Sequence, residues 1–135
     1  MAQINLLEQI ARHIEFLGFG DVADEEHDGS IFYGRMPDTP DRCICVFSSD
    51  SQFPSSDKPA RIQLYVRDKF TKDAYELSQA IVEGLIGSDG VFDGSLAGDG
   101  AHVTIEAINT SNGIGTDPRN RELYSSNFYV YYCDI

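Results

Sequence analysis

The sequence predicts an α+β fold in which two helices pack on a mainly antiparallel or mixed β-sheet of about five strands. Two segments with helical periodicity lie at residues 3–17 and 71–86, and stretches typical of strands lie between and after them. Runs of strands separated by single helices favour this class over a doubly wound parallel sheet. The expected order is α-β-β-β-α-β-β, in a single domain that spans residues 1–135.

The first predicted helix covers residues 3–17. Gly18 and Gly20 are expected to end it. Its apolar residues form a stripe along one face of the helix. The stripe could face a partner, but an amphipathic helix more often packs its apolar stripe on the core, and we adopt that interpretation. Its members recur at steps of three and four: Ile4, Leu7, Ile10, Ala11, Ile14 and Leu17.

Residues 21–28, with the sequence DVADEEHD, predict an exposed acidic loop. The segment contains five acids and no Lys or Arg, and like charges so close together repel one another. A short strand is expected at 31–33. The two prolines in 36–41 lack a backbone N–H, so this segment must turn or run extended, and the apolar run at 43–47 predicts a buried strand.

Residues 61–67 show the clearest strand pattern, because apolar and polar side chains alternate. Thr71 is the expected N-cap of the second helix, and Phe70 and Tyr75 are placed to form a hydrophobic staple. Gly87 is the expected end of that helix. Its inner stripe is formed by Ala74, Leu77, Ile81 and Leu85.

Residues 87–100 predict tight turns or a mobile surface loop, because they hold five glycines and three aspartates. Two further strands are expected after this segment. Alternating apolar residues place one at 103–107 and the last at 128–132.

The chain has 10 Lys plus Arg and 22 Asp plus Glu, a formal net charge of −12. Generic attraction to DNA phosphates requires clustered cations that release counterions, so nucleic-acid binding is disfavoured. The N-terminal segment has no basic stretch followed by an apolar run, and charged residues interrupt its first apolar region. We therefore expect neither a signal peptide nor a membrane span.

The three cysteines are Cys43, Cys45 and Cys133. Their odd number, in a chain without a secretion signal, predicts reduced thiols in a cytoplasm. Cys43 and Cys45 would share one face of a strand and could, with Cys133 and a histidine, supply four zinc ligands. Core packing is favoured, because structural zinc ligands usually come in close pairs on turns.

No specific enzyme motif is found in the sequence: the Walker loop, the dinucleotide fingerprint, the metalloprotease helix motif and the nucleophile elbow are absent. Asp89, Asp93 and Asp99 could bind a metal ion, but they lack the alternating ligands and the closing Glu of an EF-hand. Turn formation is the favoured interpretation. We therefore nominate no catalytic residue, no metal site and no cofactor.

The basic residues are segregated along the chain. The basic residues at 58–72 could form an ordinary solvated face. Another interpretation is that the acidic loop at 21–28 contacts the basic segment at 58–72 of a neighbouring subunit, which would be a heterologous contact able to close a ring. Half of all Lys and Arg fall in that basic segment: Lys58, Arg61, Arg67, Lys69 and Lys72.

Read as a whole, the order and spacing of five segments resemble the phage minor capsid or tail terminator family, which is encoded in the head-to-tail module of long-tailed phages and prophages. The long Gly-Asp segment at 87–100 and the three cysteines depart from that pattern. The segments are INLLEQIARHIEFLGFG (4–20), GRMPDTPDRCICVF (34–47), PARIQLYVRDK (59–69), AYELSQAIVEGLIG (74–87) and TDPRNRELYSSNFYVYY (116–132).

The resemblance implies a non-enzymatic structural virion protein that forms a ring, expected to be a hexamer, on the phage tail tube. The ring would end tube polymerisation and provide the docking surface for the head connector, so tail tube and connector proteins are the expected partners. The protein would assemble in the host cytoplasm and remain at the head-tail junction of the virion. DNA would cross the ring without specific binding, because a lumen lined by carboxylates repels phosphate.

Two sets of residues are candidates for contacts, chosen because they are expected to be exposed. Asp117, Pro118 and Asn120 are instead expected to shape the turn before the last strand. The candidates for a subunit or tail interface are Arg67, Lys69, Arg119 and Arg121. The candidates for an acidic lumen or partner loops are Asp24, Glu25, Glu26, Asp28, Asp89, Asp93 and Asp99.

Two other classes of protein remain open from the sequence. An acidic DNA mimic could inhibit a nucleic-acid-binding enzyme by presenting carboxylates in place of phosphates. An enzyme could use Asp89, Asp93 and Asp99 as a metal site. Salt-sensitive binding to a basic protein would favour the first class, and thermal stabilisation by a metal ion would favour the second.

Overall fold

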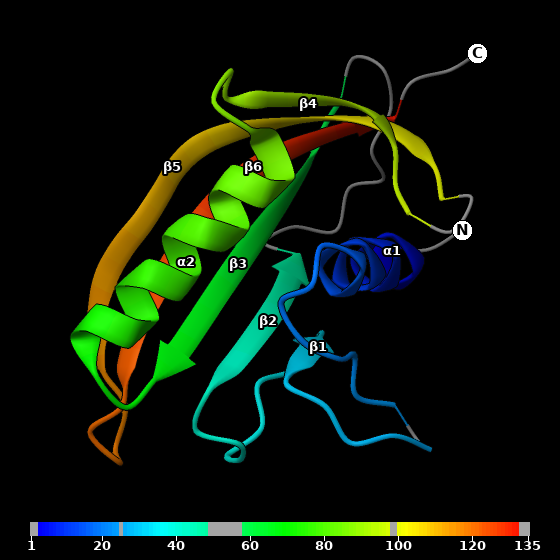
Figure 1. Ribbon diagram of the computed structural model, residues 1–135. Coiled ribbons are helices and arrows are strands. Elements are labelled where there is room, and N and C mark those ends of the chain that lie inside the picture. Colours follow the sequence, from blue (N-terminus) through cyan, green and yellow to red (C-terminus); the bar gives the residue numbers. More distant parts are fainter. Residues whose placement is uncertain (1–2, 25, 49–57, 98–99, 133–135) are drawn as a thin grey trace.

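Both helices lie on one face of a six-stranded sheet (Figure 1). The computed structural model describes residues 3–24, 26–48, 58–97 and 100–132. The predicted α+β class is confirmed, with one strand more than expected. The elements are α1 (Gln3–Phe16), β1 (Ile31–Tyr33), β2 (Cys43–Ser48), β3 (Ala60–Asp68), α2 (Thr71–Ile86), β4 (Val91–Ser95), β5 (His102–Thr116) and β6 (Glu122–Tyr132).

The strand order in the sheet is β1-β2-β3-β6-β5-β4. β1 pairs with β2 in parallel, and the other neighbouring strands pair antiparallel. The sheet is therefore mixed, as predicted. In the β3–β6 pair Arg67 is opposite Leu123, so the end of β3 meets the start of β6. This register brings together residues that lie more than fifty positions apart in the sequence.

The core lies between the helices and the sheet. The alternation predicted for β3 is confirmed, because Ile62, Leu64 and Val66 are buried on the helix side. The described members of the predicted helical stripes are also buried, except Leu17, which follows the end of α1 and is half-buried against the core. The buried members are Leu7, Ile10, Ala11 and Ile14 from α1, and Ala74, Leu77, Ile81 and Leu85 from α2. Burying these apolar side chains is the main stabilising term of the fold.

The start of α2 differs from the prediction. Phe70 is the N-cap residue, and it makes no side-chain capping bond. Thr71 is the first helical residue, and its hydroxyl donates a hydrogen bond to Glu122 Oε1 at 2.7 Å. The predicted cap and staple are therefore wrong, because β6 offers Thr71 an acceptor from outside the helix. Gly87 ends the helix as predicted, with φ 65°, and its N–H donates to Glu83 O.

The segment 87–100, predicted to be only turns or loop, contains the edge strand β4. Asp93 and Gly94 are poor strand residues, so local propensity gave no strand signal. The strand forms because β5 lies beside it and Phe92 packs against the core. This correction adds a sixth strand to the sheet.

β5 is also longer than the predicted 103–107. Beyond Ala107 it continues to Thr116 alongside β6, with register shifts between Ala107 and Thr116. Figure 1 shows that this part of β5 curves along β6. Bulges increase local twist and bend a strand. The Asn, Ser and Gly residues of this stretch hid the strand from sequence patterns.

The second face of the sheet carries a smaller buried cluster of Phe32, Cys43 and Cys45, packed against Met36 and Tyr65. The sulfur atoms of Cys43 and Cys45 lie 3.5 Å apart, so the prediction that they share one face is confirmed. Their hydrogen bond lowers the pKa of Cys43 and raises the pKa of Cys45. Cys133 lies outside the described residues.

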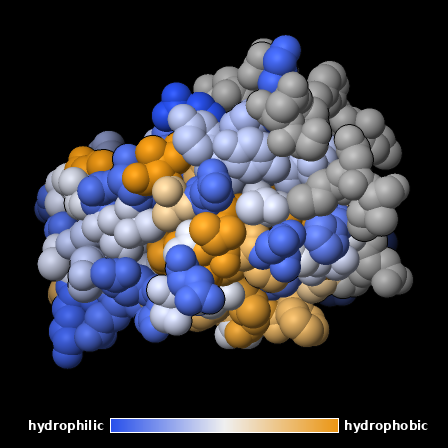
Figure 2. Space-filling view, turned by 90° about the horizontal axis from the view of Figure 1, so that it is seen from above, coloured by the Kyte–Doolittle hydropathy of each residue, from blue (hydrophilic) through white to orange (hydrophobic). Residues whose placement is uncertain are grey.

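Apolar groups reach the surface in patches among hydrophilic residues, as the face in Figure 2 shows. The described large apolar side chains that remain exposed are Phe16, Phe70, Tyr75, Val91, Ile108 and Ile114. Residues of this kind are candidates for contacts with other molecules. Neither helix combines the length and the hydropathy that a membrane span requires.

Candidate interaction site where β3 meets β6

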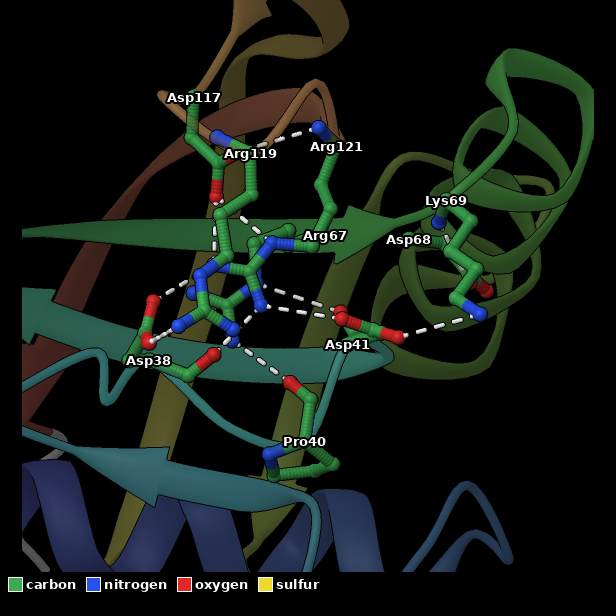
Figure 3. Close-up of polar contacts among 9 residues, drawn as sticks. All are labelled: Asp38, Pro40, Asp41, Arg67, Asp68, Lys69, Asp117, Arg119 and Arg121. Carbon is green, nitrogen blue, oxygen red and sulfur yellow. Dashed lines mark hydrogen bonds and ion pairs between the residues drawn. The ribbon is translucent and has the colours of Figure 1, made fainter.

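The four cations predicted to form an interface converge at one end of the sheet (Figure 3). Arg67 and Lys69 come from the end of β3 and the residue after it. Arg119 and Arg121 come from the turn before β6. The β3–β6 register places these two segments side by side, although they are about fifty residues apart in the sequence.

Arg121 is the most heavily bonded of the four. Its side chain is only 4% exposed, and its guanidinium contacts three carboxylates. The distances are 2.7 Å to Asp117 Oδ2, 3.1 Å to Asp38 Oδ1 and 3.2 Å to Asp41 Oδ1. It also donates to the carbonyl oxygen of Asp38. The planar guanidinium can satisfy several acceptors at once, which a lysine could not do.

Asp117 fixes the turn that carries Arg121, as predicted from its position before Pro118. Its Oδ1 accepts backbone hydrogen bonds from Arg119 at 2.9 Å and from Arg121 at 3.0 Å. Burial by itself raises the pKa of Asp117, but the hydrogen bonds from Arg121 and Arg119 outweigh it and lower the pKa to about 2. Asn120 completes the turn in the left-handed region, which asparagine tolerates.

Arg67 is also buried, with 3% of its surface exposed. Its Nε donates to Asp41 O at 3.2 Å, and its Nη2 donates to Pro40 O at 2.6 Å. We call Arg67, Arg121, Asp38, Pro40, Asp41 and Asp117 the arginine clamp. The clamp ties the segment 38–41 to β3 and to the turn before β6. The expectation that Arg67 and Arg121 are exposed is wrong, because backbone carbonyls and carboxylates enclose both.

The other two predicted cations are exposed. Lys69 Nζ lies 3.4 Å from Asp41 Oδ2, and Arg119 Nη2 lies 2.7 Å from Asp38 Oδ2. Arg42, which the sequence did not single out, is a third exposed cation, 2.9 Å from Asp68. The exposed pairs of Lys69 and Arg119 contribute little to stability, so these two cations can exchange partners with another molecule.

A hollow of about 310 Å³ lies beside the clamp, with Pro118 and Leu123 in its wall. The guanidinium groups of three arginines and the carboxylates of Asp38 and Asp117 line it, and no nucleophile paired with a base is among the lining residues. No group of three or more potential ligands able to hold a metal ion occurs among the described residues. The exposed cations beside this hollow can bind a polar protein surface.

The predicted acidic residues separate into two places. Asp24, Glu26 and Asp28 are exposed near the edge strand β1, and Asp24 Oδ1 accepts the N–H groups of Glu26 and His27. These bonds and the His27 side chain lower the pKa of Asp24 to about 2. Asp89 and Asp93 lie at the opposite edge, before and within β4.

Glu25 and Asp99 lie outside the described residues. Asp93 Oδ1 is 3.1 Å from His102 Nε2, so it has a partner within its own chain. β1 and β4 are the two edges of the strand order, but α1 contacts both regions, because Arg12 pairs with Asp24 and the ring of His13 lies 5.5 Å from that of Phe92.

Sequence reasoning missed the acceptors of the clamp. It assigned residues 36–41 only a turn or an extended path, yet Asp38 and Asp41 supply two of the carboxylates that bind Arg121. The sequence did offer one indication of these acceptors, because two aspartates each follow a proline in this short segment. That indication does not reveal the partner, which lies about eighty residues away.

The chain was compared with known proteins. A family model described as bacteriophage tail terminator protein matches residues 13–132. No curated protein matches the chain.

Proposed function

Because this chain belongs to the bacteriophage tail terminator family, whose role in tail assembly is structural, we propose that it forms a ring that caps the tail tube. The ring is a hexamer that ends tube polymerisation and provides the docking surface for the head connector. Its partners are other copies of the chain, the tail tube protein and the connector proteins. It assembles in the host cytoplasm and remains at the head-tail junction of the virion.

The observation that carries this proposal is the family match, which covers nearly all of the chain. The clamp supports it, because its geometry suits a rigid binding surface and offers no arrangement for catalysis. We propose Lys69 and Arg119 as contact residues of a subunit or tail interface. Arg67 and Arg121 act indirectly. They hold the segment 38–41, whose aspartates pair with Lys69 and Arg119.

The net charge of −12 supports the passage of DNA through the ring. Carboxylates at a lumen repel phosphates, so DNA slides without specific binding. We assign this role to Asp89 and Asp93 at the β4 edge. Asp24, Glu26 and Asp28, near the β1 edge, are the second candidates for this role.

The test measures the mass of the protein by light scattering, alone and with tail tubes, followed by negative-stain imaging of the tube ends. A hexameric mass, or a ring at one end of each tube, is the expected result. A monomer that leaves tubes uncapped would contradict the proposal. A monomer that instead binds a basic DNA-processing enzyme with strong salt sensitivity would indicate a DNA mimic.

A further inference from the structure

The side chain of Phe70 projects from the surface, although its carbonyl accepts a hydrogen bond from Ala74 N at the start of α2. Phe70 is 66% exposed, although it stands at the N-cap of α2, where Ser, Thr, Asp or Asn would satisfy a free N–H group. Lys69 and Lys72 flank it, and both are exposed. We call residues 69–72 the α2 start. An apolar ring between two ammonium groups suits a groove that is apolar inside and acidic at its rim.

The molecule has such a groove on its other helix. A depression of about 600 Å³ lies between α1 and the turn after β4, and Phe16, which is 74% exposed, stands at its wall. We call it the α1 groove. Glu8 and Glu15 lie at its rim and share one guanidinium, Arg12, at 3.8 and 3.5 Å. Its lining residues are Glu8, Gln9, Arg12, Glu15, Phe16, Ala97 and Gly100.

The local charge of the groove is negative. Arg12 also contacts Asp24 at 3.4 Å, so three carboxylates surround a single cation. Three carboxylates and one guanidinium leave a net charge of about −2, which two added ammonium groups would balance. Charge complementarity between Lys69 and Lys72 on one surface and Glu8 and Glu15 on the other is the first argument that the two surfaces fit.

Two hydrogen bonds join α1 to described residues that follow β4. Gln9 Oε1 accepts a hydrogen bond from Ala101 N at 2.7 Å, and His13 Nδ1 accepts one from Ala97 N at 3.0 Å. These bonds tie the turn after β4 to α1. A preformed apolar groove binds an aromatic side chain with little loss of conformational entropy.

The two surfaces cannot meet within one chain. Figure 1 places the start of α2 and the helix α1 on opposite sides of the molecule, with the strands β2 and β3 between them. A contact between unlike surfaces of identical subunits is heterologous, and such contacts generate closed rings or open filaments.

We propose that Phe70 of one copy inserts into the α1 groove of a second copy, where Lys69 and Lys72 pair with Glu8 and Glu15. This inference rests on the proposed ring and identifies the surfaces that join its subunits. It assigns Phe70 the part of an aromatic anchor at the centre of a subunit interface, a position where aromatic residues contribute most to binding.

The test uses the variant Phe70→Ser, which replaces the anchor by a good N-cap residue. We expect its thermal unfolding midpoint to be equal to or higher than that of the unchanged chain, because Ser can cap α2. Its self-association, measured by sedimentation, should weaken about 30-fold or more. The matched control is Ile108→Ser, which removes another exposed apolar side chain from the middle of β5, away from the end of the strand that lies beside Glu122 and Thr71, and should assemble normally.

A second variant, Ala97→Arg, fills the groove and keeps the anchor. Each variant alone should be monomeric, but an equimolar mixture should form a 1:1 heterodimer and nothing larger, because one intact anchor and one intact groove remain. No symmetric interface predicts this result. Failure of the two variants to form the heterodimer would overturn the proposal.

The outcomes also separate this inference from the proposed function. If the unchanged chain forms a ring and Phe70→Ser forms the same ring, the inference is wrong and the ring stands. If Phe70→Ser forms the ring but no longer caps tubes, the α2 start binds the tube protein and not a second copy. If the unchanged chain stays monomeric with tubes, both proposals are wrong.

Discussion

Charged side chains are usually exposed and aromatic side chains usually buried, but the reverse holds at the end of β3 and the start of α2. Arg67 is 3% exposed, whereas Phe70 is 66% exposed. The cation is buried because Pro40 and Asp41 offer it carbonyl acceptors, which offset the cost of removing a charge from water. The aromatic side chain is exposed because the described residues cover only a minor part of it. One region serves the fold, and we infer that the other serves assembly.

The clamp and the α1 groove differ in the same way. Removing a clamp residue should affect folding, because its partners are buried with it. Removing an anchor or groove residue should affect assembly alone. A clamp variant that weakens assembly without destabilising the fold, or an anchor variant that destabilises the fold, would contradict this distinction.

The largest expected effect is the loss of Arg121. We expect Arg121→Met to lower the thermal unfolding midpoint by about 5–10 °C, because three aspartates lose their shared cation. Arg119→Met is the matched control from the same turn. It removes one exposed pair with Asp38 and should lower the midpoint by about 2 °C or less. Equal effects would show that burial does not distinguish the two arginines.

An intermediate effect should appear on acidification. The folded pKa of Asp117 is about 2, below its ordinary 3.8, so its contribution to stability is present above about 3.8. It is lost as the pH falls towards 2. Asp117→Asn should therefore flatten the dependence of the unfolding free energy on pH between about 4 and 2, as followed by urea titrations.

Asp24→Asn is the control for this acid window. The pKa of Asp24 is also lowered to about 2, but its hydrogen bonds and ion pairs go to Glu26, His27 and Arg12, none of which belongs to the clamp. We expect Asp24→Asn to reduce the pH dependence of the unfolding free energy by its own separate amount. The double variant should show the sum of the two reductions. An unchanged pH dependence in Asp117→Asn would mean that the clamp does not depend on this carboxylate.

The smallest expected effect concerns His13, which holds a wall of the α1 groove. Burial lowers its pKa below 6.5, so the fold favours the neutral ring that accepts the Ala97 N–H. Its contribution to stability is present above about pH 6.5 and is lost as the pH falls below that value. His13→Gln should reduce the loss of stability between pH 7 and 5, measured by urea titration. The same pH dependence in both proteins would exclude His13 as its source.

Much of the fold could be predicted from the sequence, because local periodicity reports which face of an element is buried. The stripes of α1 and α2 and the alternation in β3 were of this kind. β4 and the far part of β5 were not, since their strand conformation depends on pairing with neighbours that local composition does not indicate. The part that Asp117 plays in its turn could be predicted, because its partners are two and four residues away.

The sequence alone determined the order of the helices, the position of most strands, the acidic charge and the resemblance to the tail terminator family. Only the tertiary structure decided which cations are buried and which remain available. Arg67 and Arg121 look no different from Lys69 and Arg119 in the sequence. The antiparallel register of β3 and β6 brings the first two beneath the segment 38–41, where distant carbonyls and carboxylates bind them, and leaves the other two at the rim.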